Sequence, residues 1–317
     1  MNSLRIIFMG TPEFAAYNLK ALHQKGAQIV AVVTAPDRPA GRGQKLQPSA
    51  VKMMAKELNI PVLQPEKLRD PEFQNALRTY RPDLQVVVAF RMLPESVWSL
   101  PPKGTFNLHA SLLPQYRGAA PINWAVMNGE TETGVTTFFL NHEIDTGSII
   151  MQESIAILPN DNAGIIHDKL MKLGADLVVK TVEAISKNEA KTIAQIDSHT
   201  LKPAPKLFRD DGRIDWHLTS EMIHNHIRGL SPYPAAWTEL VEKGKKPVMM
   251  KVFETEIASS SKNLLPGAVQ CNGKDRMAVG TGNGAVLIKE LQLAGKKRMS
   301  TDDFLKGYRW SDEILFV

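Results

Sequence analysis

The sequence predicts an α/β fold, in which a doubly wound, mostly parallel, Rossmann-like sheet is followed by a small antiparallel OB-like β-barrel. Three observations support this prediction. The first half alternates short β-branched runs with amphipathic helical patterns, as a parallel sheet covered on both faces requires. A stretch with prolines interrupts the pattern near residue 200, and the remainder consists of short alternating segments broken by glycine and asparagine.

Each expected element of the first half is a short run of one period. The expected strands are Leu4–Met9, Gln28–Val33, Leu84–Ala89, Thr105–His109, Gly134–Leu140 and Ser148–Ile155. The expected helices are Pro12–Gln24, Ser49–Leu58, Pro71–Thr79 and Ala163–Ser186. In such a fold, ligands bind beyond the carboxyl ends of the strands, so the turns after these strands are the first places to look for a site.

The second half predicts one helix and a set of short strands. The helix is Ser220–Arg228, and the strands are Ala236–Val241, Val248–Ile257, Ala268–Gln270, Arg276–Gly280 and Ala285–Leu293. The expected domains are therefore 1–189, a linker at 190–207, and a barrel domain at 208–317.

Composition indicates a globular protein and leaves a polyanionic partner open. The chain has 43% hydrophobic and 22% charged residues, and no apolar run approaches the roughly 20 residues that span a bilayer. The N-terminus lacks the apolar core of a secretory signal, so we expect a cytoplasmic protein with no membrane contact. From residue 190 onward, 19 Lys and Arg face 15 Asp and Glu, which leaves +4 of the net +5 in the last third.

Metal chemistry has no support in the sequence. Cys271 is the only cysteine, so an internal disulfide and a cysteine-rich metal site are excluded, and we expect a packed side chain. The histidines and carboxylates show no ligand spacing such as H-E-x-x-H.

Asn107, His109 and Asp145 form the candidate catalytic set. Side chains alternate along a strand, so Asn107 and His109 project from the same side of the Thr105–His109 strand and can converge on one oxygen atom. Asp145 begins an Asp-Thr-Gly run about thirty residues later. Taken alone, an Asp before Thr-Gly is usually a turn residue, and a histidine ending an apolar strand is commonly a satisfied core residue.

Two loops can be interpreted either as functional or as purely structural. Gly10-Thr11-Pro12 follows the first strand but is no G-x-G-x-x-G fingerprint, so it is either a plain strand-to-helix turn or one that lines the site. The segment 35–45 is rich in proline, glycine and cations, and is either a solvated linker or a loop that closes on a phosphodiester backbone.

The motifs together resemble one family from end to end. Gly-Thr-Pro-Glu-Phe at 10–14, Pro-Asp-Arg-Pro-Ala-Gly-Arg-Gly at 36–43, Asn-x-His-x-Ser-Leu-Leu-Pro at 107–114, Tyr-Arg-Gly-Ala-Ala-Pro at 116–121 and Asp-Thr-Gly at 145–147 closely resemble methionyl-tRNA formyltransferases. Arg-Gly-Leu-Ser-Pro-Tyr-Pro at 228–234 continues the match. The Asn, His and Asp set is shared with other enzymes that use 10-formyltetrahydrofolate, so it identifies the chemistry and not the acceptor.

The resemblance implies transfer of the formyl group of 10-formyltetrahydrofolate to the α-amino group of methionyl initiator tRNA. Asn107 and His109 would stabilise the oxyanion, and Asp145 would orient His109 and help to remove the amine proton. Folate-binding residues would be Ser111, Leu112, Leu113 and Pro114, with Phe90, Arg91, Met92 and Leu93 as a second wall. Many relatives carry Tyr-Gly where this chain has Phe90-Arg91, so a bulkier, charged side chain replaces a residue with no Cβ beside the expected pterin pocket.

The resemblance also names the partners. Arg42 would contact the acceptor stem of the tRNA, with Arg38 and Lys45 as further candidates, and no metal is needed. We expect a monomer, although the sequence does not determine the oligomeric state. Three alternatives stay open: a formyltransferase acting on a small amine such as a nucleotide sugar or a purine precursor, a folate or RNA carrier without chemistry, and a hydride-transfer enzyme, which the missing glycine fingerprint disfavours.

Overall fold

The computed structural model describes residues 4–40, 45–258, 264–308 and 314–317, and they form two compact units. Unit 1 consists of residues 1–118, 134–155 and 168–203, and unit 2 consists of residues 119–133, 156–167 and 204–317. The units therefore interleave along the chain. The linear division at 1–189, 190–207 and 208–317 stays a prediction.

Unit 1 is built on a sheet with the strand order β5-β2-β1-β6-β7-β8-β9. The bounds are β1 Arg5–Gly10, β2 Gln28–Val33, β5 Val62–Leu63, β6 Leu84–Val88, β7 Thr105–His109, β8 Glu132–Phe139 and β9 Ile149–Ala156. The pairs from β5 to β7 are parallel, and β7 pairs with β8 antiparallel. The expected mostly parallel, doubly wound sheet is thus confirmed.

The strand order of unit 1 determines where a ligand site can form. The chain moves outward from β1 to β2 and β5, and then returns to β6 on the other side of β1. Loops on either side of such a reversal leave in opposite directions, and this opens a crevice at the carboxyl ends of the strands. The ends of β6 and β7 lie at this edge.

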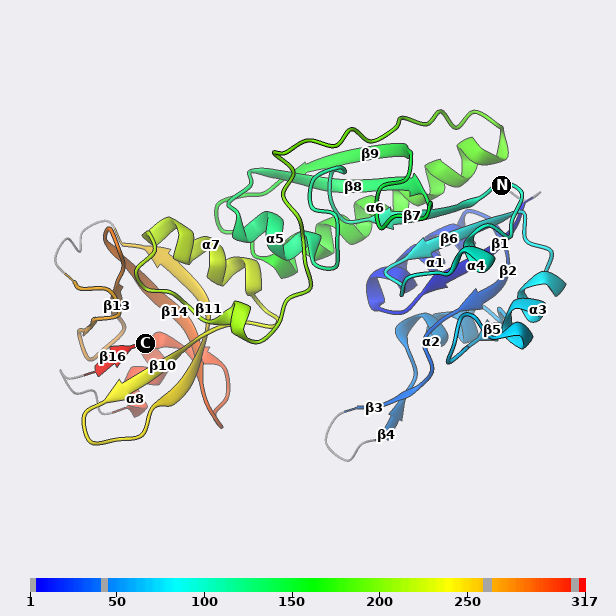
Figure 1. Ribbon diagram of the computed structural model, residues 1–317. Helices are drawn as coiled ribbons and strands as arrows, with labels where there is room; N and C mark the ends of the chain where they lie inside the picture. Colours follow the sequence, from blue (N-terminus) through cyan, green and yellow to red (C-terminus); the bar gives the residue numbers. More distant parts are fainter. Residues whose placement is uncertain (1–3, 41–44, 259–263, 309–313) are drawn as a thin grey trace. The chain divides into compact units, whose positions relative to one another are not determined.

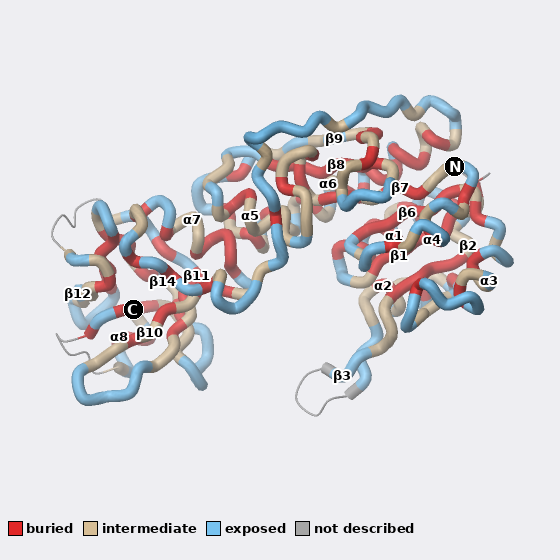
Figure 2. Tube along the Cα trace, viewed as in Figure 1, coloured by how far each residue is buried: buried red, intermediate tan, exposed pale blue. Residues whose placement is uncertain are grey.

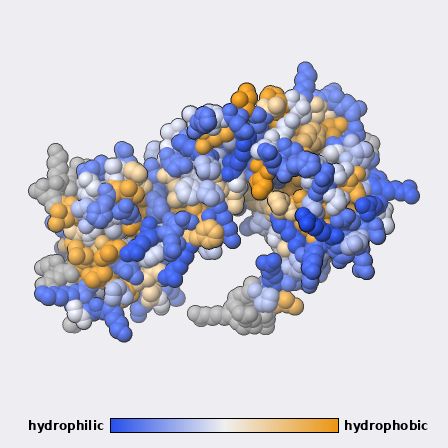
Figure 3. All heavy atoms as spheres, in the orientation of Figure 1, coloured by the Kyte–Doolittle hydropathy of each residue, from blue (hydrophilic) through white to orange (hydrophobic). Residues whose placement is uncertain are grey.

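Helices cover the sheet of unit 1 (Figure 1). They are α1 Glu13–Gln24, α2 Ala50–Glu57, α3 Pro71–Thr79, the short α4 Glu95–Trp98 and the long α6 Ala163–Ser186, whose first residues belong to unit 2. Ser49 and Asp70 cap α2 and α3 by accepting from the backbone N–H of Lys52 and Glu72. The buried residues follow the strands (Figure 2), and the outer surface in view is mostly hydrophilic (Figure 3).

The segment 35–45 contains more regular structure than expected. β3, Arg38–Ala40, pairs antiparallel with β4, Lys45–Gln47, as a two-stranded hairpin whose tip, 41–44, is outside the described residues. The sequence did not predict this pairing, because proline lacks a backbone N–H donor and therefore favours the prediction of a loop.

Unit 2 is a nearly closed antiparallel barrel, as predicted. Its strands are β10 Ala236–Glu242, β11 Val248–Ile257, β12 Val269–Cys271, β13 Met277–Gly280, β14 Ala285–Leu293, β15 Met299–Ser300 and β16 Ile314–Phe316. The order is β12-β13-β14-β11-β10-β16, and a bridge between Ala268 and Leu315 links the two ends. Three helical segments complete it: α5 Pro121–Met127, α7 Ser220–Leu230 and α8 Thr301–Gly307, with a 3-10 turn at Asp210–Gly212.

A buried arginine and backbone groups join α7 to the segment 156–167. Arg228 donates to the carbonyl oxygen of Asp161 at 2.8 Å, and burial lowers the pKa of its guanidinium. The backbone N–H of Gly164 donates to the carbonyl oxygen of Ser231 at 3.1 Å. These contacts explain why a segment from the first half of the sequence packs with the barrel. Within the described ranges, no helix is long and apolar enough to cross a membrane.

Candidate active site

Strand β7 carries Asn107 and His109 to the sheet edge where β6 also ends. Phe106, Leu108 and Leu84 are buried and hold the strand in the sheet, while Asn107 is half-buried. Asn107 pairs in register with Phe138 of β8, and His109 pairs with Thr136. The two polar side chains are two residues apart and therefore lie on one face, as the alternation of a strand requires.

The two ring nitrogens of His109 have different partners. Nε2 lies 2.8 Å from the carbonyl oxygen of Tyr116, and Nδ1 lies 3.8 Å from Oδ2 of Asp145. A carbonyl oxygen only accepts, so Nε2 carries a proton and the neutral ring has its lone pair on Nδ1. The His109 side chain is 7% exposed, which shields both contacts from water.

Asp145 lies in a turn that the surrounding chain holds in place. Its φ of 56° is a left-handed conformation that residues with a Cβ rarely adopt. Its Oδ2 accepts from the backbone N–H of Gly118 at 3.0 Å. A Cβ on Gly147 would lie 1.6 Å from the carbonyl oxygen of Phe139, so only glycine fits at the end of the Asp-Thr-Gly run.

The Asn107 side chain differs from that of His109 in its hydrogen bonding. Within the part of the chain that the structure describes, its side-chain amide makes no hydrogen bond, although it is half-buried. The amide therefore has two N–H donors and one carbonyl acceptor available for a ligand.

Side chains of strands β8 and β9 hold the Ser111–Pro114 segment by hydrogen bonds to its backbone. Thr136 Oγ1 donates to the carbonyl oxygen of Ser111 at 2.7 Å, and Gln152 Nε2 donates to that of Leu113 at 2.8 Å. The Ser111 hydroxyl is buried and donates to the carbonyl oxygen of Gln115 at 2.6 Å. Leu113 is 3% exposed, whereas Leu112 and Pro114 are half-buried.

The Phe90–Leu93 segment follows β6 and combines buried and exposed side chains. Leu93 is buried, and Met92 is 75% exposed. Arg91 turns away from the sheet and donates to the carbonyl oxygens of Pro65 and Glu66, while its guanidinium lies 5.6 Å from the centre of the Phe90 ring. Partial burial and, secondarily, Arg38 lower the pKa of Arg91. Arg91 therefore connects the segment after β6 to the loop at residues 65–66.

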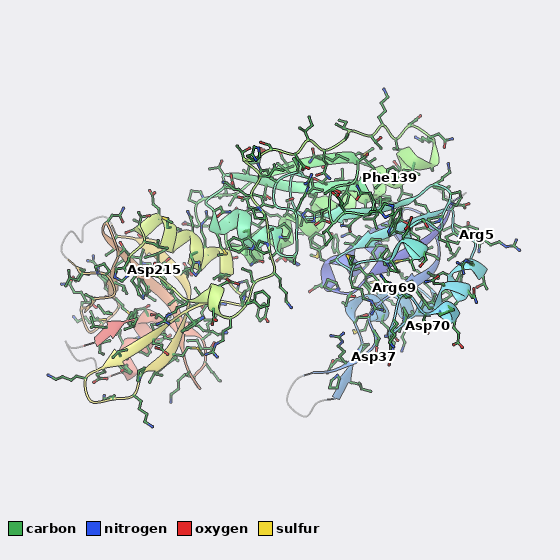
Figure 4. The ribbon with its side chains drawn as sticks, viewed as in Figure 1. Arg5, Asp37, Arg69, Asp70, Phe139 and Asp215 are labelled. Atoms are coloured by element: carbon green, nitrogen blue, oxygen red, sulfur yellow. The ribbon has the colours of Figure 1, made fainter. Side chains whose placement is uncertain are left out.

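The base of the β3–β4 hairpin is fixed by Asp37, labelled in Figure 4. Its carboxylate lies 2.6 Å from Nζ of Lys52 and accepts from Gln64 Nε2 at 2.8 Å. The Lys52 and Gln64 side chains lower the pKa of Asp37. Arg38 is exposed on β3; Arg42 lies outside the described residues, and so does the side chain of Lys45.

A hollow that the sequence did not indicate lies where β7 begins and β8 ends. It has a volume of about 450 Å³, and its lining includes Trp98, Thr105, Leu140 and Phe139, the last labelled in Figure 4. Trp98 and Leu140 also pack against the same buried cluster as Phe90 and Leu93. The hollow and the Phe90–Leu93 segment thus both adjoin one apolar cluster.

The described residues contain no group of three or more His, Cys, Asp or Glu side chains arranged to hold a metal ion. Cys271 is half-buried, and burial raises the pKa of its thiol to about 12, which disfavours the thiolate. The prediction that Cys271 is a packed, unreactive side chain agrees with this environment.

Comparison with known proteins defines the class. Residues 4–182 match the family model described as formyl transferase, and residues 206–309 match the model of the formyl transferase C-terminal domain. A solved N-formyltransferase from Helicobacter canadensis, in complex with folinic acid and dTDP-3-aminofucose, superimposes with a TM-score of 0.65 over 93% of this chain and 100% of that chain. At 18% identity this likeness shows a shared fold.

Closer relatives narrow the class to one family. The methionyl-tRNA formyltransferase of Bacteroides thetaiotaomicron is 55% identical over 98% of this chain and 97% of its own length. That of Flavobacterium johnsoniae is 48% identical over 99% of each chain. The chain belongs to the methionyl-tRNA formyltransferase family.

Three groups at the site were not found from the sequence. The carbonyl oxygen of Tyr116 and the N–H of Gly118 bind His109 and Asp145, and both belong to the Tyr-Arg-Gly motif, which carried no predicted role. Gln195 contacts the Asp145 turn from within the expected linker, where no motif marked it.

Proposed function

We propose that this enzyme transfers the formyl group of 10-formyltetrahydrofolate to the α-amino group of methionine esterified to initiator tRNA. The observation that carries the proposal is the site at the end of β7, where His109 lies between Tyr116 and Asp145 and the neighbouring Asn107 amide has no partner among the described residues. The family membership of the whole chain supports tRNA as the acceptor.

The residues suit attack by an amine on a formyl carbon. An α-amino group titrates near 7.7–8.0, so much of the nucleophile is neutral without a strong base. As the C–N bond forms, the formyl oxygen gains negative charge, and Asn107 Nδ2 donates to it. The amine must then lose a proton. Nδ1 of His109 can accept this proton because Nε2 is already protonated, and the adjacent Asp145 carboxylate stabilises the imidazolium.

Collapse of the tetrahedral intermediate completes the transfer. The bond between the formyl carbon and N10 of the folate breaks, and N10 takes up the proton from the His109 imidazolium. The products are the formylated amine and tetrahydrofolate. Each proton and electron pair is accounted for without a metal or an oxidant.

We assign the folate to the surface formed by two segments. Leu112, Pro114 and the backbone of Ser111 and Leu113 form one side, because the side chains of Ser111 and Leu113 are buried. Phe90, Met92 and Leu93 form the other, with Arg91 held against the loop at 65–66.

We assign the tRNA to cationic surfaces on each unit. In unit 1, Arg38 and Lys45 belong to the β3–β4 hairpin, and Arg42 lies between its two strands in the sequence. In unit 2, the β10–β11 and β14–β15 turns lie next to each other, because the backbone N–H of Ala294 donates to the carbonyl oxygen of Met249. These turns expose six cations: Lys243, Lys245, Lys246, Lys296, Lys297 and Arg298.

The cationic turns have an excess of positive charge. Glu242 pairs with Lys245 at 2.8 Å and Glu290 pairs with Arg298, so the acids of these turns offset only part of the charge. Phosphates are bound by such exposed lysine clusters through counterion release, without reading of sequence. We call the five lysines of these turns, together with Arg298, the barrel-end lysines.

A cytoplasmic location follows from the proposed acceptor, and a monomeric state stays a prediction.

The test is an acceptor panel with purified protein and 10-formyltetrahydrofolate. We expect rapid formylation of initiator methionyl-tRNA and slow or absent formylation of elongator methionyl-tRNA and of amino sugars linked to a nucleotide. Preference for a small amine would replace the proposed function with the alternative. Binding of both ligands without release of tetrahydrofolate would indicate a carrier.

A further inference from the structure

The extended segment 190–203, expected to be a linker, runs along the outside of β9 (Figures 1 and 2). Ile193 exchanges backbone hydrogen bonds with Ile149 at 2.8 and 2.9 Å. Every residue from 191 to 200 is exposed except Gln195, which is half-buried. Gln195 is therefore the residue of this stretch that is best shielded from solvent.

Gln195 uses both ends of its amide on the active-site loops. Nε2 donates to the carbonyl oxygens of Asp145 at 2.9 Å and Gly147 at 2.8 Å. Oε1 accepts from Nε and Nη2 of Arg117 at 3.1 and 2.8 Å. Carbonyl oxygens only accept and a guanidinium only donates, so these four contacts fix the orientation of the amide.

The two loops that Gln195 joins are those that hold His109. Tyr116 binds Nε2 of His109, Asp145 faces Nδ1, and Gly118 binds the Asp145 carboxylate. Arg117 lies between Tyr116 and Gly118 and is also paired with Asp197 of the same segment at 2.6 Å. One side chain thus links the partners of both ring nitrogens.

The backbone of the Asp145 turn needs such support. A left-handed conformation at a residue with a Cβ is strained and persists only where surrounding contacts impose it. The two hydrogen bonds from Gln195 hold this turn at the carbonyl oxygen of Asp145 itself and at that of Gly147. Without them, the carboxylate would not be held at its distance from His109.

We propose that Gln195 is a positioning residue for formyl transfer, which keeps Asp145 and the Tyr116–Gly118 loop in register around His109. This inference rests on the proposed function. Gln195 contacts neither substrate in the proposed mechanism, so its effect is on the rate of the chemical step and not on ligand affinity.

The decisive variant is Gln195→Glu. A carboxylate still accepts from Arg117, but it cannot donate to the two carbonyl oxygens of the Asp145 turn and repels them. We expect kcat to fall by up to about a hundredfold, because small displacements of catalytic groups have effects of that size. KM for folate and for tRNA should stay near the wild-type values. Gln195→Ala should lower kcat likewise.

Two further measurements separate positioning from a general structural role. Ile196→Ala, a change at an 80% exposed side chain of the same segment, should leave kcat unchanged. The ¹⁵N resonances of His109 in histidine-labelled enzyme should shift in Gln195→Glu and stay in place in Ile196→Ala.

Wild-type kcat with unshifted His109 resonances in Gln195→Glu would overturn the inference and leave the proposed function intact. Equal losses in Gln195→Glu and Ile196→Ala would overturn it as well. A wild-type enzyme that formylates no amine would instead refute the proposed function.

Discussion

At the scale of single residues, the site depends on the unequal environment of the two nitrogens of His109. Nε2 donates to a backbone carbonyl oxygen, and only Nδ1 gains and loses a proton during the proposed reaction. The role of Asp145 is then electrostatic, because its carboxylate stabilises a positive charge that forms 3.8 Å away.

Asp145→Asn tests this electrostatic role. The amide keeps the size of the side chain and removes the charge, so we expect kcat to fall about a hundredfold or more, as when a donor is removed from an oxyanion site. KM for folate should change little. Steady-state kinetics with initiator methionyl-tRNA give the answer, and kcat within a few-fold of the wild-type value would show that Asp145 has no such role.

Gly147→Ala tests the packing of the Asp145 turn. The new Cβ would lie 1.6 Å from the carbonyl oxygen of Phe139, so the turn must move, and we expect a loss of about 3 kcal/mol in the free energy of unfolding. Urea unfolding measures it. Gly307→Ala is the control and should cost nothing, since among the described residues the added Cβ meets no atom within 4 Å beyond its chain neighbours and its own helix. Equal stability of both variants would contradict the tight turn.

The sequence was sufficient to place some site residues and not others. Asn107 and His109 share a face because strand alternation requires it, and the structure agrees. The partners of His109 and Asp145 on residues 116–118 are backbone groups, and any residue has those. Gln195 could not be predicted, because its contact with Asp145 depends on how a segment without regular structure runs over the sheet.

At the scale of elements, apolar periodicity decided what could be predicted. The β2, β7, β11 and β14 strands and the α3 and α6 helices have the expected bounds, because their patterns are uninterrupted. The short β5, α4 and α5 elements were not predicted, since such short runs give too little periodicity. The β3–β4 hairpin was missed because prolines and glycines masked its pairing.

The hairpin gives a prediction at this scale. Asp37→Ala removes the carboxylate that holds Lys52 and Gln64 at the hairpin base. We expect KM for tRNA to rise several-fold because the hairpin that carries Arg38 is less well oriented, and KM for folate to stay the same. Glu57→Ala, at an exposed position of the neighbouring α2, is the control. An unchanged KM for tRNA would show that the hairpin base has no part in binding.

Helix α7 predicts a pH dependence of stability. Burial lowers the pKa of His224 and His226, and Nε2 of His226 has no hydrogen-bond partner among the described residues. These two histidines bind a proton more readily in the unfolded chain than in the folded protein. The stability that their neutral forms contribute is therefore complete above about pH 6.5 and is lost as the pH falls through the lowered folded-state pKa.

Urea unfolding at pH 7.5 and 5.5 measures this contribution. The wild-type protein should lose stability at the lower pH. His226→Phe should lose less, because phenylalanine does not titrate and the unfolded variant binds one proton fewer. A loss of the same size in both proteins would contradict the assignment to His226.

At the scale of the whole molecule, the two compact units interleave along the chain. Residues 119–133 and 156–167 pack with the barrel, although they lie between strands of the parallel sheet. Their contacts are made by backbone groups and by buried side chains such as Arg228, and also by Asn123, which donates to the carbonyl oxygen of Gly229 at 2.8 Å. Such long-range packing leaves no periodic trace in a sequence.

The barrel-end lysines predict a salt-dependent affinity for tRNA. In a variant with Lys243, Lys246, Lys296 and Lys297 changed to Gln, the dissociation constant for tRNA should rise. The slope of its logarithm against that of the salt concentration should become shallower by about 0.9 for each phosphate that the variant no longer binds. Folate affinity should not change. A slope equal to that of the wild-type protein would show that this end of the barrel does not bind phosphates.

The central claim is that the Asn107 amide stabilises the oxyanion of formyl transfer. The most direct measurement is single-turnover formylation of initiator methionyl-tRNA by Asn107→Ala, with both substrates saturating and their dissociation constants measured separately. We predict a rate about a hundredfold to a thousandfold below the wild-type rate, with both dissociation constants unchanged. A single-turnover rate equal to that of the wild-type enzyme would contradict the account.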